Sequence, residues 1–350
     1  MNDGETVDIV VPQVGARAPM VNGGIADFLA NHPDLELGGG QGYTVERRKH
    51  MEVFALHRLP KSKVNPIRDV EFTAIRGPHG TVPIRVLYPD SGEERRRAGG
   101  ELGGIVYFHG GGYCTGSVDE FENGLRLLAE VSACVIFAPD YRLAPEFPYP
   151  TQLDEFDAVI DWALDGAARQ RGVDPARLLA AGDGAGGNMA TAVCLRRRDE
   201  GKRPVAGQLL LYPSTDLPAG TPAAEENRTG FYLQANGIFG FADHYLPHGS
   251  VNPSAATPAS TTYFAYIAPG RLACARLAAL PPAAVVTNGY DPLRDVGVAY
   301  AGKLRAVGGL AHWRHYADLT HGWLQMTAWS AGARDAAREV GRLAGEMAYR

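Results

Sequence analysis

The chain has 350 residues, of which 45% are hydrophobic, so it is long enough to bury a large core. A net charge of -5 with both signs present argues against nucleic acid as the main partner, because phosphate binding requires a basic face. No apolar run approaches the ~18 residues that a membrane-spanning helix requires, so we expect a globular protein without a membrane span.

Strand and helix signals alternate along most of the chain. A hairpin is predicted first, with arms at 70–76 and 82–88, and short apolar runs typical of buried parallel strands follow it. These runs cover residues 104–108, 134–138, 177–181, 208–212, 283–287 and 312–316. Helical patterns occupy residues 121–132, 152–164, 187–198, 292–307 and 331–347. The alternation predicts an α/β fold with a mostly parallel central sheet and helices on both faces.

Two segments fall outside this alternation. Residues 1–68 contain helical patterns around 25–30 and 45–59 but no strand pattern, and residues 217–270 are rich in Pro, Gly, Ala and aromatic side chains. Either segment can fold over the carboxyl ends of the strands, where open α/β sheets bind ligands. We therefore expect an N-terminal cap segment at 1–68 and a catalytic domain at 69–350, with 217–270 as a further cap or lid segment.

The turn after the predicted strand at 177–181 carries the most informative residue of the chain. Residues 178–188 read L-L-A-A-G-D-G-A-G-G-N, which is the strand-turn-helix pattern of a nucleophile elbow, G-x-S-x-G. Gly184 occupies the position of the serine. A non-glycine residue at positive φ costs on the order of 1–3 kcal/mol, so glycine relieves strain at this turn while removing the attacking hydroxyl.

A glycine-rich turn, His109-Gly110-Gly111-Gly112, directly follows the predicted strand at 104–108. Glycines let backbone N–H groups approach an oxygen and point at it, as an oxyanion hole requires. The pattern H-G-G-G after a strand is also the form that this hole takes in lipases and esterases.

An acid and a histidine follow in the order expected for a serine hydrolase on an α/β sheet. Asp291 lies in Y-D-P-L-R-D after the strand at 283–287, and His321 lies in H-G-W after the strand at 312–316. In the triads of such enzymes the order along the chain is elbow, acid, histidine. Asp291 is therefore expected to orient His321 as a general base.

Together these motifs resemble the hormone-sensitive-lipase-like, type IV bacterial esterases, over roughly residues 70–350. The motifs are H-G-G-G at 109–112, Y-R-L-A-P-E at 141–146, G-D-x-A-G-G-N at 182–188, D-P-L-R-D at 291–295 and H-G-W at 321–323. The resemblance implies an α/β-hydrolase fold with a helical N-terminal cap and a small acyl ester or related carbonyl compound as substrate. It departs from the family at Gly184, where the family has serine.

The resemblance also implies roles for single residues. The backbone N–H groups expected to form the oxyanion hole are those of Gly110, Gly111 and Ala185. Asp291 and His321 are expected to be the acid and the base. The side chains and backbone expected to line the substrate pocket belong to His109, Gly112, Tyr113 and Asp183.

The glycines of the elbow create a second pattern. Gly182, Gly184 and Gly187 spell G-x-G-x-x-G between a strand and a helix, as in dinucleotide-binding folds. Such a site needs an acid about twenty residues further on, and no acid stands at the right place. The dinucleotide interpretation also leaves H-G-G-G and H-G-W unexplained, so we do not favour an NAD-type oxidoreductase.

Three functions remain open. The first is a hydrolase of esterase lineage whose serine has been replaced, so that little or no covalent serine hydrolysis is expected. The second is a natural non-hydrolytic enzyme in which His321 acts as a general base and the oxyanion hole stabilises an enolate or alkoxide, giving elimination, cyclisation or isomerisation. The third is a non-catalytic small-molecule binder. An intact Asp291 and His321 favour the first two.

No other residue offers a convincing nucleophile. Cys114, just after the oxyanion turn, is expected to be a buried and unreactive thiol. Asp183 precedes the elbow position and is expected to point away from it, and Ser117 is expected to brace the loop after H-G-G-G.

The remaining features bear on cofactors, location and assembly. Four widely spaced cysteines without a C-x-x-C pair favour neither a zinc site nor a disulfide framework, and we expect no metal or other cofactor. They are Cys114, Cys134, Cys194 and Cys274. The first nineteen residues lack the apolar core of a secretory signal, which favours a cytoplasmic location. The basic run Arg95–Arg97 is interpreted as a solvated loop, and the helix at 331–347 offers a face for a homodimer.

Overall fold

The computed structural model describes residues 16–246 and 265–350. Its centre is an eight-stranded sheet in the order β1-β2-β4-β3-β5-β6-β7-β8. The first hairpin is antiparallel, β2 also pairs antiparallel with β4, and the remaining strands are parallel. The strands are β1 (Asp69–Gly77), β2 (Gly80–Tyr88), β3 (Leu102–Phe108), β4 (Cys134–Pro139), β5 (Val173–Asp183), β6 (Gly207–Leu211), β7 (Ala283–Tyr290) and β8 (Leu310–Thr320). The expected α/β-hydrolase sheet is confirmed.

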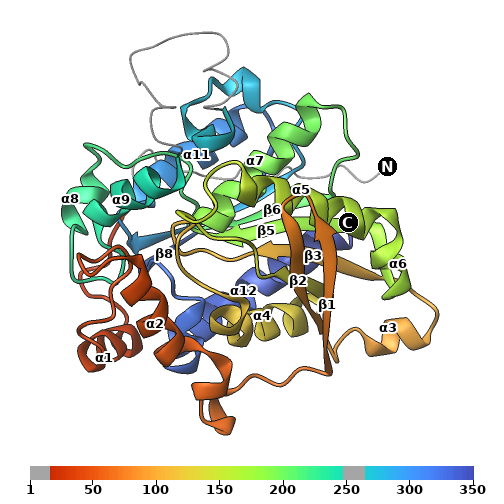
Figure 1. Ribbon diagram of the computed structural model, residues 1–350, viewed down its shortest axis with the longest axis horizontal. Helices are drawn as coiled ribbons and strands as arrows, with labels where there is room; N and C mark the ends of the chain where they lie inside the picture. Colours follow the sequence, from red (N-terminus) through yellow and green to blue (C-terminus); the bar gives the residue numbers. More distant parts are fainter. Residues whose placement is uncertain (1–15, 247–264) are drawn as a thin grey trace, which may run out of the picture.

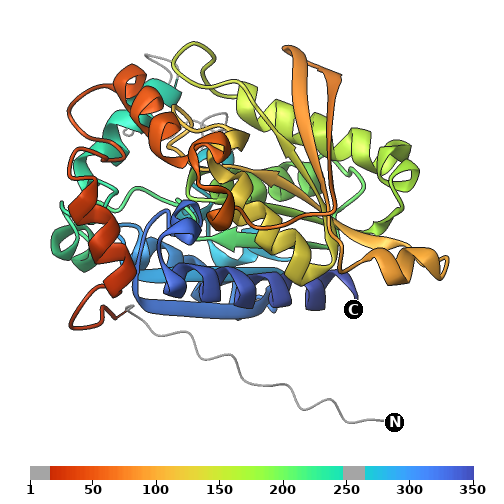
Figure 2. The same ribbon diagram turned by 90° about the horizontal axis from the view of Figure 1, so that it is seen from below.

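Helices cover both faces of the sheet (Figures 1 and 2). On one face lie α4 (Val118–Ser132) and α12 (Ala331–Ala348), and on the other lie α5 (Thr151–Trp162), α7 (Ala185–Asp199) and α11 (Arg294–Ala306). The central strands β3, β4, β6 and β7 are buried along their whole length, as their continuous apolar sequences predict for strands covered on both faces. None of the helices in the described ranges is long and apolar enough to cross a membrane.

The C-terminal helix α12 is amphipathic and places its apolar side against α4. Its buried side chains include Val340, Leu343 and Met347. A Cβ on Gly341 would lie 2.8 Å from the Val131 side chain of α4, so the two helices are in close contact. The apolar face that sequence analysis offered to a homodimer is therefore covered within one chain.

The basic run Arg95–Arg97 is not a loop, which corrects the prediction. It ends a short exposed helix, α3 (Glu93–Arg97), in which Glu93 forms ion pairs with Arg96 and Arg97. Pairs three and four residues apart meet on one side of a helix, which favours the helical form of this acidic-basic sequence.

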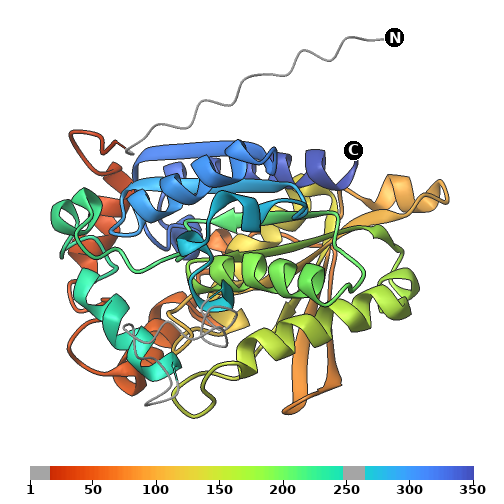
Figure 3. The same ribbon diagram turned by 90° about the horizontal axis from the view of Figure 1, so that it is seen from above.

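The N-terminal segment lies beside the segment that follows β6. Figures 1 and 3 show α1 (Gly23–Asn31) and α2 (Tyr43–Phe54) at the same end of the sheet as α8 (Pro222–Glu226) and α9 (Ala235–Tyr245). A single parallel bridge between Leu37 and Leu233 joins the two segments. Residues 1–15 and 247–264, which belong to the two expected cap segments, lie outside the described residues.

The stretch that precedes α1 runs along the edge strand β8. The N–H of Ala18 donates to the carbonyl of Ala317 at 2.8 Å, and the N–H of Asn22 donates to the carbonyl of Asp318 at 2.8 Å. One end of the described chain is thus hydrogen-bonded to the last strand of the sheet.

Candidate active site

The elbow is a sharp backbone turn between β5 and α7. Gly184 has φ 51° and ψ -115°, and α7 begins at the next residue, Ala185. The N–H of Gly184 donates to the carbonyl of Leu211 at 2.9 Å, and its carbonyl accepts from the N–H groups of Asn188 and Ser214 at 3.1 and 3.0 Å. The turn is therefore held by backbone bonds and by a positive φ that favours glycine.

The position of the missing side chain faces the imidazole of His321. A Cβ built on Gly184 would lie 2.9 Å from Nε2 and 3.3 Å from Cε1 of that ring. The motifs predict that Gly184 and His321 share one site, and the fold brings them together. The imidazole stands slightly closer to the elbow than a Cβ tolerates, so a larger residue at 184 requires a small shift of the ring.

Asp291 and His321 form a buried hydrogen-bonded pair. The Nδ1–H of His321 donates to Oδ2 of Asp291 at 2.9 Å, and both side chains are almost fully buried. Oδ1 of Asp291 accepts from the N–H of Leu293 at 2.8 Å, which fixes the carboxylate. With the proton on Nδ1, the lone pair of Nε2 faces Gly184.

Asn288 supports this pair and was missed by sequence analysis. Its Nδ2 donates to the carbonyl of Thr320 at 3.1 Å, and its Oδ1 accepts from Nε1–H of Trp323 at 3.0 Å. Asn288 thus joins the end of β7 to the loop that carries His321. The tryptophan of H-G-W was visible in the sequence, but its partner was not, because Asn288 lies within an otherwise apolar strand.

Hydrogen bonds to the carbonyl oxygen of Gly111 hold the oxyanion turn. That oxygen accepts from the N–H of Cys114 at 3.1 Å and from the N–H and hydroxyl of Thr115, both at 2.9 Å. The N–H of Gly110 does not point to the cavity. It donates to Oδ1 of Asp183 at 2.8 Å, which corrects the expectation that Gly110 is a free oxyanion donor.

His109 and Asp183 support the turn from behind and do not line the cavity, which corrects their assignment to the substrate pocket. Oδ1 of Asp183 also accepts from the hydroxyl of Tyr107 at 2.9 Å, and burial raises the pKa of this carboxyl to about 6. His109 stacks on Tyr141 with ring centroids 4.3 Å apart, and burial lowers its pKa. As expected, the carboxylate of Asp183 is not directed at the nucleophile position.

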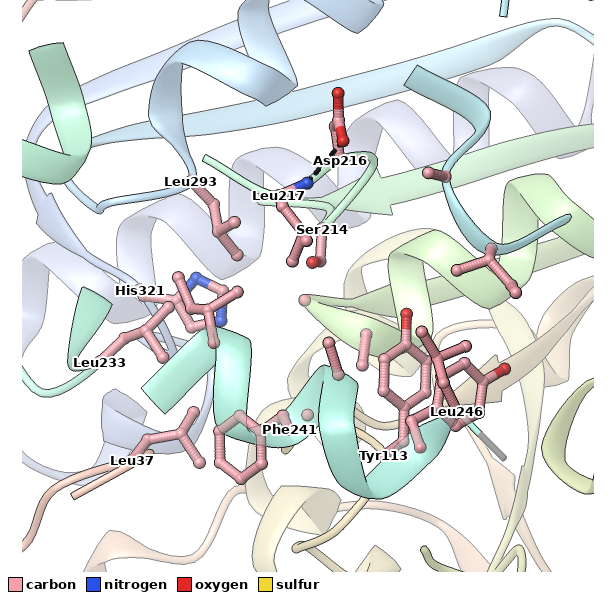
Figure 4. A pocket seen from close by; sticks show the side chains of 18 of the residues that line it. Leu37, Tyr113, Ser214, Asp216, Leu217, Leu233, Phe241, Leu246, Leu293 and His321 are labelled. Carbon is pink, nitrogen blue, oxygen red and sulfur yellow. Dashed lines mark hydrogen bonds between the residues drawn. The ribbon is translucent and has the colours of Figure 1, made fainter. Parts of the chain in front are cut away.

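A cavity of about 260 Å³ adjoins the elbow (Figure 4). Gly112, Tyr113, Gly184, Ala185 and His321 all line it. Most of the remaining wall is apolar and includes Leu37, Leu233, Ile238, Phe241, Leu246 and Leu293. The polar side chains in the wall besides Tyr113 and His321 are Ser214, Asp216, Tyr245 and Arg271. The cavity suits a mainly apolar ligand with a few polar groups.

Among the described residues, none of the alternative nucleophiles is hydrogen-bonded to His321. Burial raises the pKa of the Cys114 thiol to about 12, in keeping with an unreactive cysteine. Ser117 precedes α4, and its hydroxyl donates to Oε1 of Glu120 at 3.1 Å. Ser214, which sequence analysis did not single out, lines the cavity, but no hydrogen bond among the described residues joins it to His321. Nor do the described side chains include a cluster of three or more His, Cys, Asp or Glu that could hold a metal ion.

Comparisons with known proteins identify the family of the chain. A family model described as alpha/beta hydrolase fold matches residues 105–325. Esterase LipI of Mycobacterium tuberculosis is 35% identical over 270 residues, which cover 77% of this chain and 79% of LipI. Carboxylic ester hydrolase LipN of the same organism is 34% identical over 301 residues, which cover 85% of this chain and 74% of LipN.

Solved structures show the same fold. The hyperthermophilic esterase from the archaeon Pyrobaculum calidifontis superposes with a TM-score of 0.79 and 29% identity, covering 95% of this chain and 100% of that chain. A serine-to-alanine mutant of LAE6, an α/β-hydrolase enzyme from the metagenome of Lake Arreo, superposes with a TM-score of 0.79 and 28% identity, covering 95% and 98%. The chain therefore belongs to the hormone-sensitive-lipase-like carboxylesterases of the α/β-hydrolase family.

Proposed function

We propose that this chain binds a small acyl ester or related carbonyl compound in the cavity beside Gly184 and carries out little or no covalent serine hydrolysis. One observation supports this above all. The elbow, the imidazole and the cavity are in place, but position 184 has no hydroxyl to attack the carbonyl. The described parts of the two cap segments are proposed to cover the bound ligand, since Leu37 from one and Leu233 from the other line the cavity.

We assign the oxyanion hole to the N–H groups of Gly111 and Ala185. Ala185 opens α7, so its N–H has no partner within the helix and lies at the positive end of the helix dipole. Among the described residues no acceptor is paired with the N–H of Gly111, whereas Gly110 is bonded to Asp183. Two such donors suffice to hold a carbonyl oxygen that becomes negatively charged.

The base is complete but lacks its usual partner. In a serine triad, Nε2 of the histidine removes the serine proton while the acid stabilises the charged ring. Here Asp291 is placed to stabilise the charged ring, but Gly184, the residue that Nε2 faces at the elbow, has no hydroxyl. Loss of the serine in a comparable triad lowers kcat by about 10⁶-fold, so the chain is expected to be a very poor esterase.

Restoring the hydroxyl tests this proposal. Gly184→Ser should raise hydrolysis of p-nitrophenyl acetate by about 10³-fold, less than the ~10⁶-fold that a serine supplies in an adapted triad, because His321 must shift. Gly184→Ala is the matched control, since it adds the same Cβ and the same backbone strain without the hydroxyl. If Gly184→Ser hydrolyses no faster than Gly184→Ala, the remaining groups are not aligned for acyl transfer.

A second candidate function is proton transfer by His321 on the bound ligand. The buried and oriented Asp291–His321 pair favours it, because a protein that only binds has no need of an oriented base. Nε2 would take a proton from a carbon beside the carbonyl, and the N–H groups of Gly111 and Ala185 would hold the enolate oxygen. The protonated ring would then return the proton to another carbon, or to a leaving hydroxyl that departs as water.

Product analysis separates these candidates. The unaltered chain and its His321→Ala variant would be incubated with carbonyl compounds. Mass spectrometry would then measure the molecular masses of the recovered ligands. Turnover to a product that is isomeric with the substrate or lighter by water, and that His321→Ala abolishes, supports proton transfer. Binding without turnover by either chain supports a binding protein, and hydrolysis gained only with Gly184→Ser supports the disabled esterase.

A further inference from the structure

The ring of Phe241 forms the wall of the cavity next to the oxyanion turn. Phe241 belongs to α9, and Figure 4 places its side chain near Leu37 and on the opposite side of the cavity from Ser214. A Cβ added to Gly112 would overlap the Phe241 ring, so the ring lies directly against the bare backbone of the turn. A ligand with its carbonyl at the turn must therefore fit beside this ring.

A backbone contact between two glycines holds α9 at this distance. A Cβ on Gly237 of α9 would overlap the carbonyl oxygen of Gly38 in the N-terminal segment. Conversely, a Cβ on Gly38 would lie 2.8 Å from Cα of Gly237 and 3.2 Å from Cε2 of Phe241. Any side chain at either glycine would push α9, and the Phe241 ring with it, away from the segment below.

The neighbouring backbone continues this contact. The N–H of Leu37 donates to the carbonyl of Tyr232 at 3.0 Å, and the N–H of Gln234 donates to the carbonyl of Leu37 at 2.9 Å. The N–H of Gly38 donates to Oε2 of Glu46, a buried side chain of α2, at 3.0 Å. The Gly38 segment is therefore a fixed support for α9.

We propose that Phe241 sets the upper size of the ligand, and that the Gly38–Gly237 contact holds its ring over the oxyanion turn. The identity of the ligand as a carbonyl compound rests on the proposed function. The cavity of about 260 Å³ lies just below the roughly 300–1,000 Å³ of most ligand pockets, so the ligand class is an ester with a compact acyl group.

Two glycines of the same helix provide a matched test. Gly237→Ala adds a methyl group where the backbone of Gly38 lies, whereas a Cβ on the exposed Gly240 meets nothing within 4 Å. Both changes replace glycine with alanine inside α9, which favours the helix by about 1 kcal/mol in each case. The two variants therefore differ in the contact with Gly38 alone. Phe241→Ala removes the ring without disturbing that contact.

Binding of intact esters gives the readout, because the unaltered chain has no hydroxyl at position 184 to become acylated. Calorimetry would measure Kd for p-nitrophenyl acetate, hexanoate and decanoate. We expect the unaltered chain and Gly240→Ala to bind the acetate most tightly. Gly237→Ala and Phe241→Ala should prefer a longer ester, with a gain of about tenfold, the low end of what a hydrophobic pocket discriminates per methylene.

Each outcome decides a different statement. If Phe241→Ala keeps the preference of the unaltered chain, or if Gly240→Ala shifts it as much as Gly237→Ala, the inference on Phe241 is wrong while ester binding stands. If no ester binds to any chain, the proposed function fails. An anilinonaphthalene sulfonate dye then tests the wall itself, with tighter binding expected only for Gly237→Ala and Phe241→Ala. Should Phe241→Ala not fold, Phe241→Leu replaces it in the same series.

Discussion

The two halves of the candidate site are held together by different kinds of bond. On the base side the hydrogen bonds are made by side chains. His321 donates to Asp291, and Asn288 connects β7 to the loop that carries His321. On the elbow side, the bonds of Gly184 all come from its own N–H and carbonyl. The base depends on its neighbours' side chains, whereas the elbow keeps its shape with no side chain at all. The shape of the elbow therefore does not depend on a side chain at position 184.

The largest effect is expected on the base side. In the Gly184→Ser chain, Asp291→Asn should lower kcat by about 10⁴-fold, the effect of the corresponding change in a serine protease triad. The amide would favour the wrong tautomer of His321. Hydrolysis of p-nitrophenyl acetate measures it, with Asp335→Asn on the exposed side of α12 as the control. Retention of a tenth or more of the activity would show that Asp291 does not orient the base.

On the elbow side, we expect the main effect of a substitution to be on the free energy of unfolding. Asp183→Leu leaves the buried N–H of Gly110 and hydroxyl of Tyr107 without an acceptor. Each such group costs about 1–3 kcal/mol, so the free energy of unfolding should fall by roughly 2–6 kcal/mol. Urea unfolding measures the change. Asp183→Asn keeps an oxygen for both donors and should lose less than half as much; equal losses would mean that these bonds are not what Asp183 contributes.

A buried acid in the first turn of α4 should make stability depend on pH. Burial raises the pKa of Glu120 to about 8, from an ordinary value of 4.5. The folded chain then holds a proton that the unfolded chain releases, so this contribution to stability is complete below pH 4.5 and is lost as pH rises to 8. Glu120→Gln, which stays neutral, should unfold at a higher temperature than the unaltered chain at pH 8 and at a similar temperature at pH 5.

Two other groups give the same direction and remain in that variant. Burial raises the pKa of Glu46 to about 7 and that of Asp183 to about 6. The Glu120→Gln chain should therefore lose its slope between pH 7 and 8. Below pH 7 contributions of opposite sign add up, because burial lowers the pKa of His50 and His109 and their effect on stability rises with pH. A slope that is unchanged above pH 7 would contradict the assignment to Glu120.

The smallest effect is expected far from both halves of the site. Arg338 forms an ion pair with Asp335 on the outer side of α12, at 2.8 Å, and both side chains are exposed. Exposed pairs of this kind contribute about 0.2–1 kcal/mol. Arg338→Ala should leave ester binding unchanged and shift the denaturant midpoint only slightly, which sets the background for the changes described above.

The sheet was largely predictable from sequence, because its central strands are mostly apolar runs. The first and last residues of the strands were less predictable. The strand predicted at 177–181 begins four residues earlier, at Val173, where it pairs with Leu102 of β3. Likewise β8 extends to Thr320, directly before His321. Such ends are set by pairing between strands, which a local pattern does not contain.

Helix α9 was not predicted as a helix, since Gly237 and Gly240 lower its helix propensity. Burial of apolar side chains such as Ile238 and Phe241 stabilises this helix instead.

The roles of residues in the site divide in the same way. Gly184, Asp291 and His321 could be placed because each follows a strand, and the carboxyl ends of parallel strands share one edge of the sheet. Asp183 and Gly110 could not, since the direction of a side chain at the end of a strand depends on the register with its neighbour. Asp183 directly precedes the nucleophile position, yet its carboxylate accepts from the oxyanion turn at Gly110.

The bonds from Ala18 and Asn22 to β8 bear on how the protein folds. They join residues separated by almost the whole chain, so these two backbone bonds cannot form until β8 has been synthesised. Contacts of such long sequence separation form late, because closing a long loop costs entropy before the contact is made. The segment that carries α1 leaves the ribosome before β8 does. It nevertheless reaches its final position late in folding. Until then the outer edge of β8 is open to pairing with other chains.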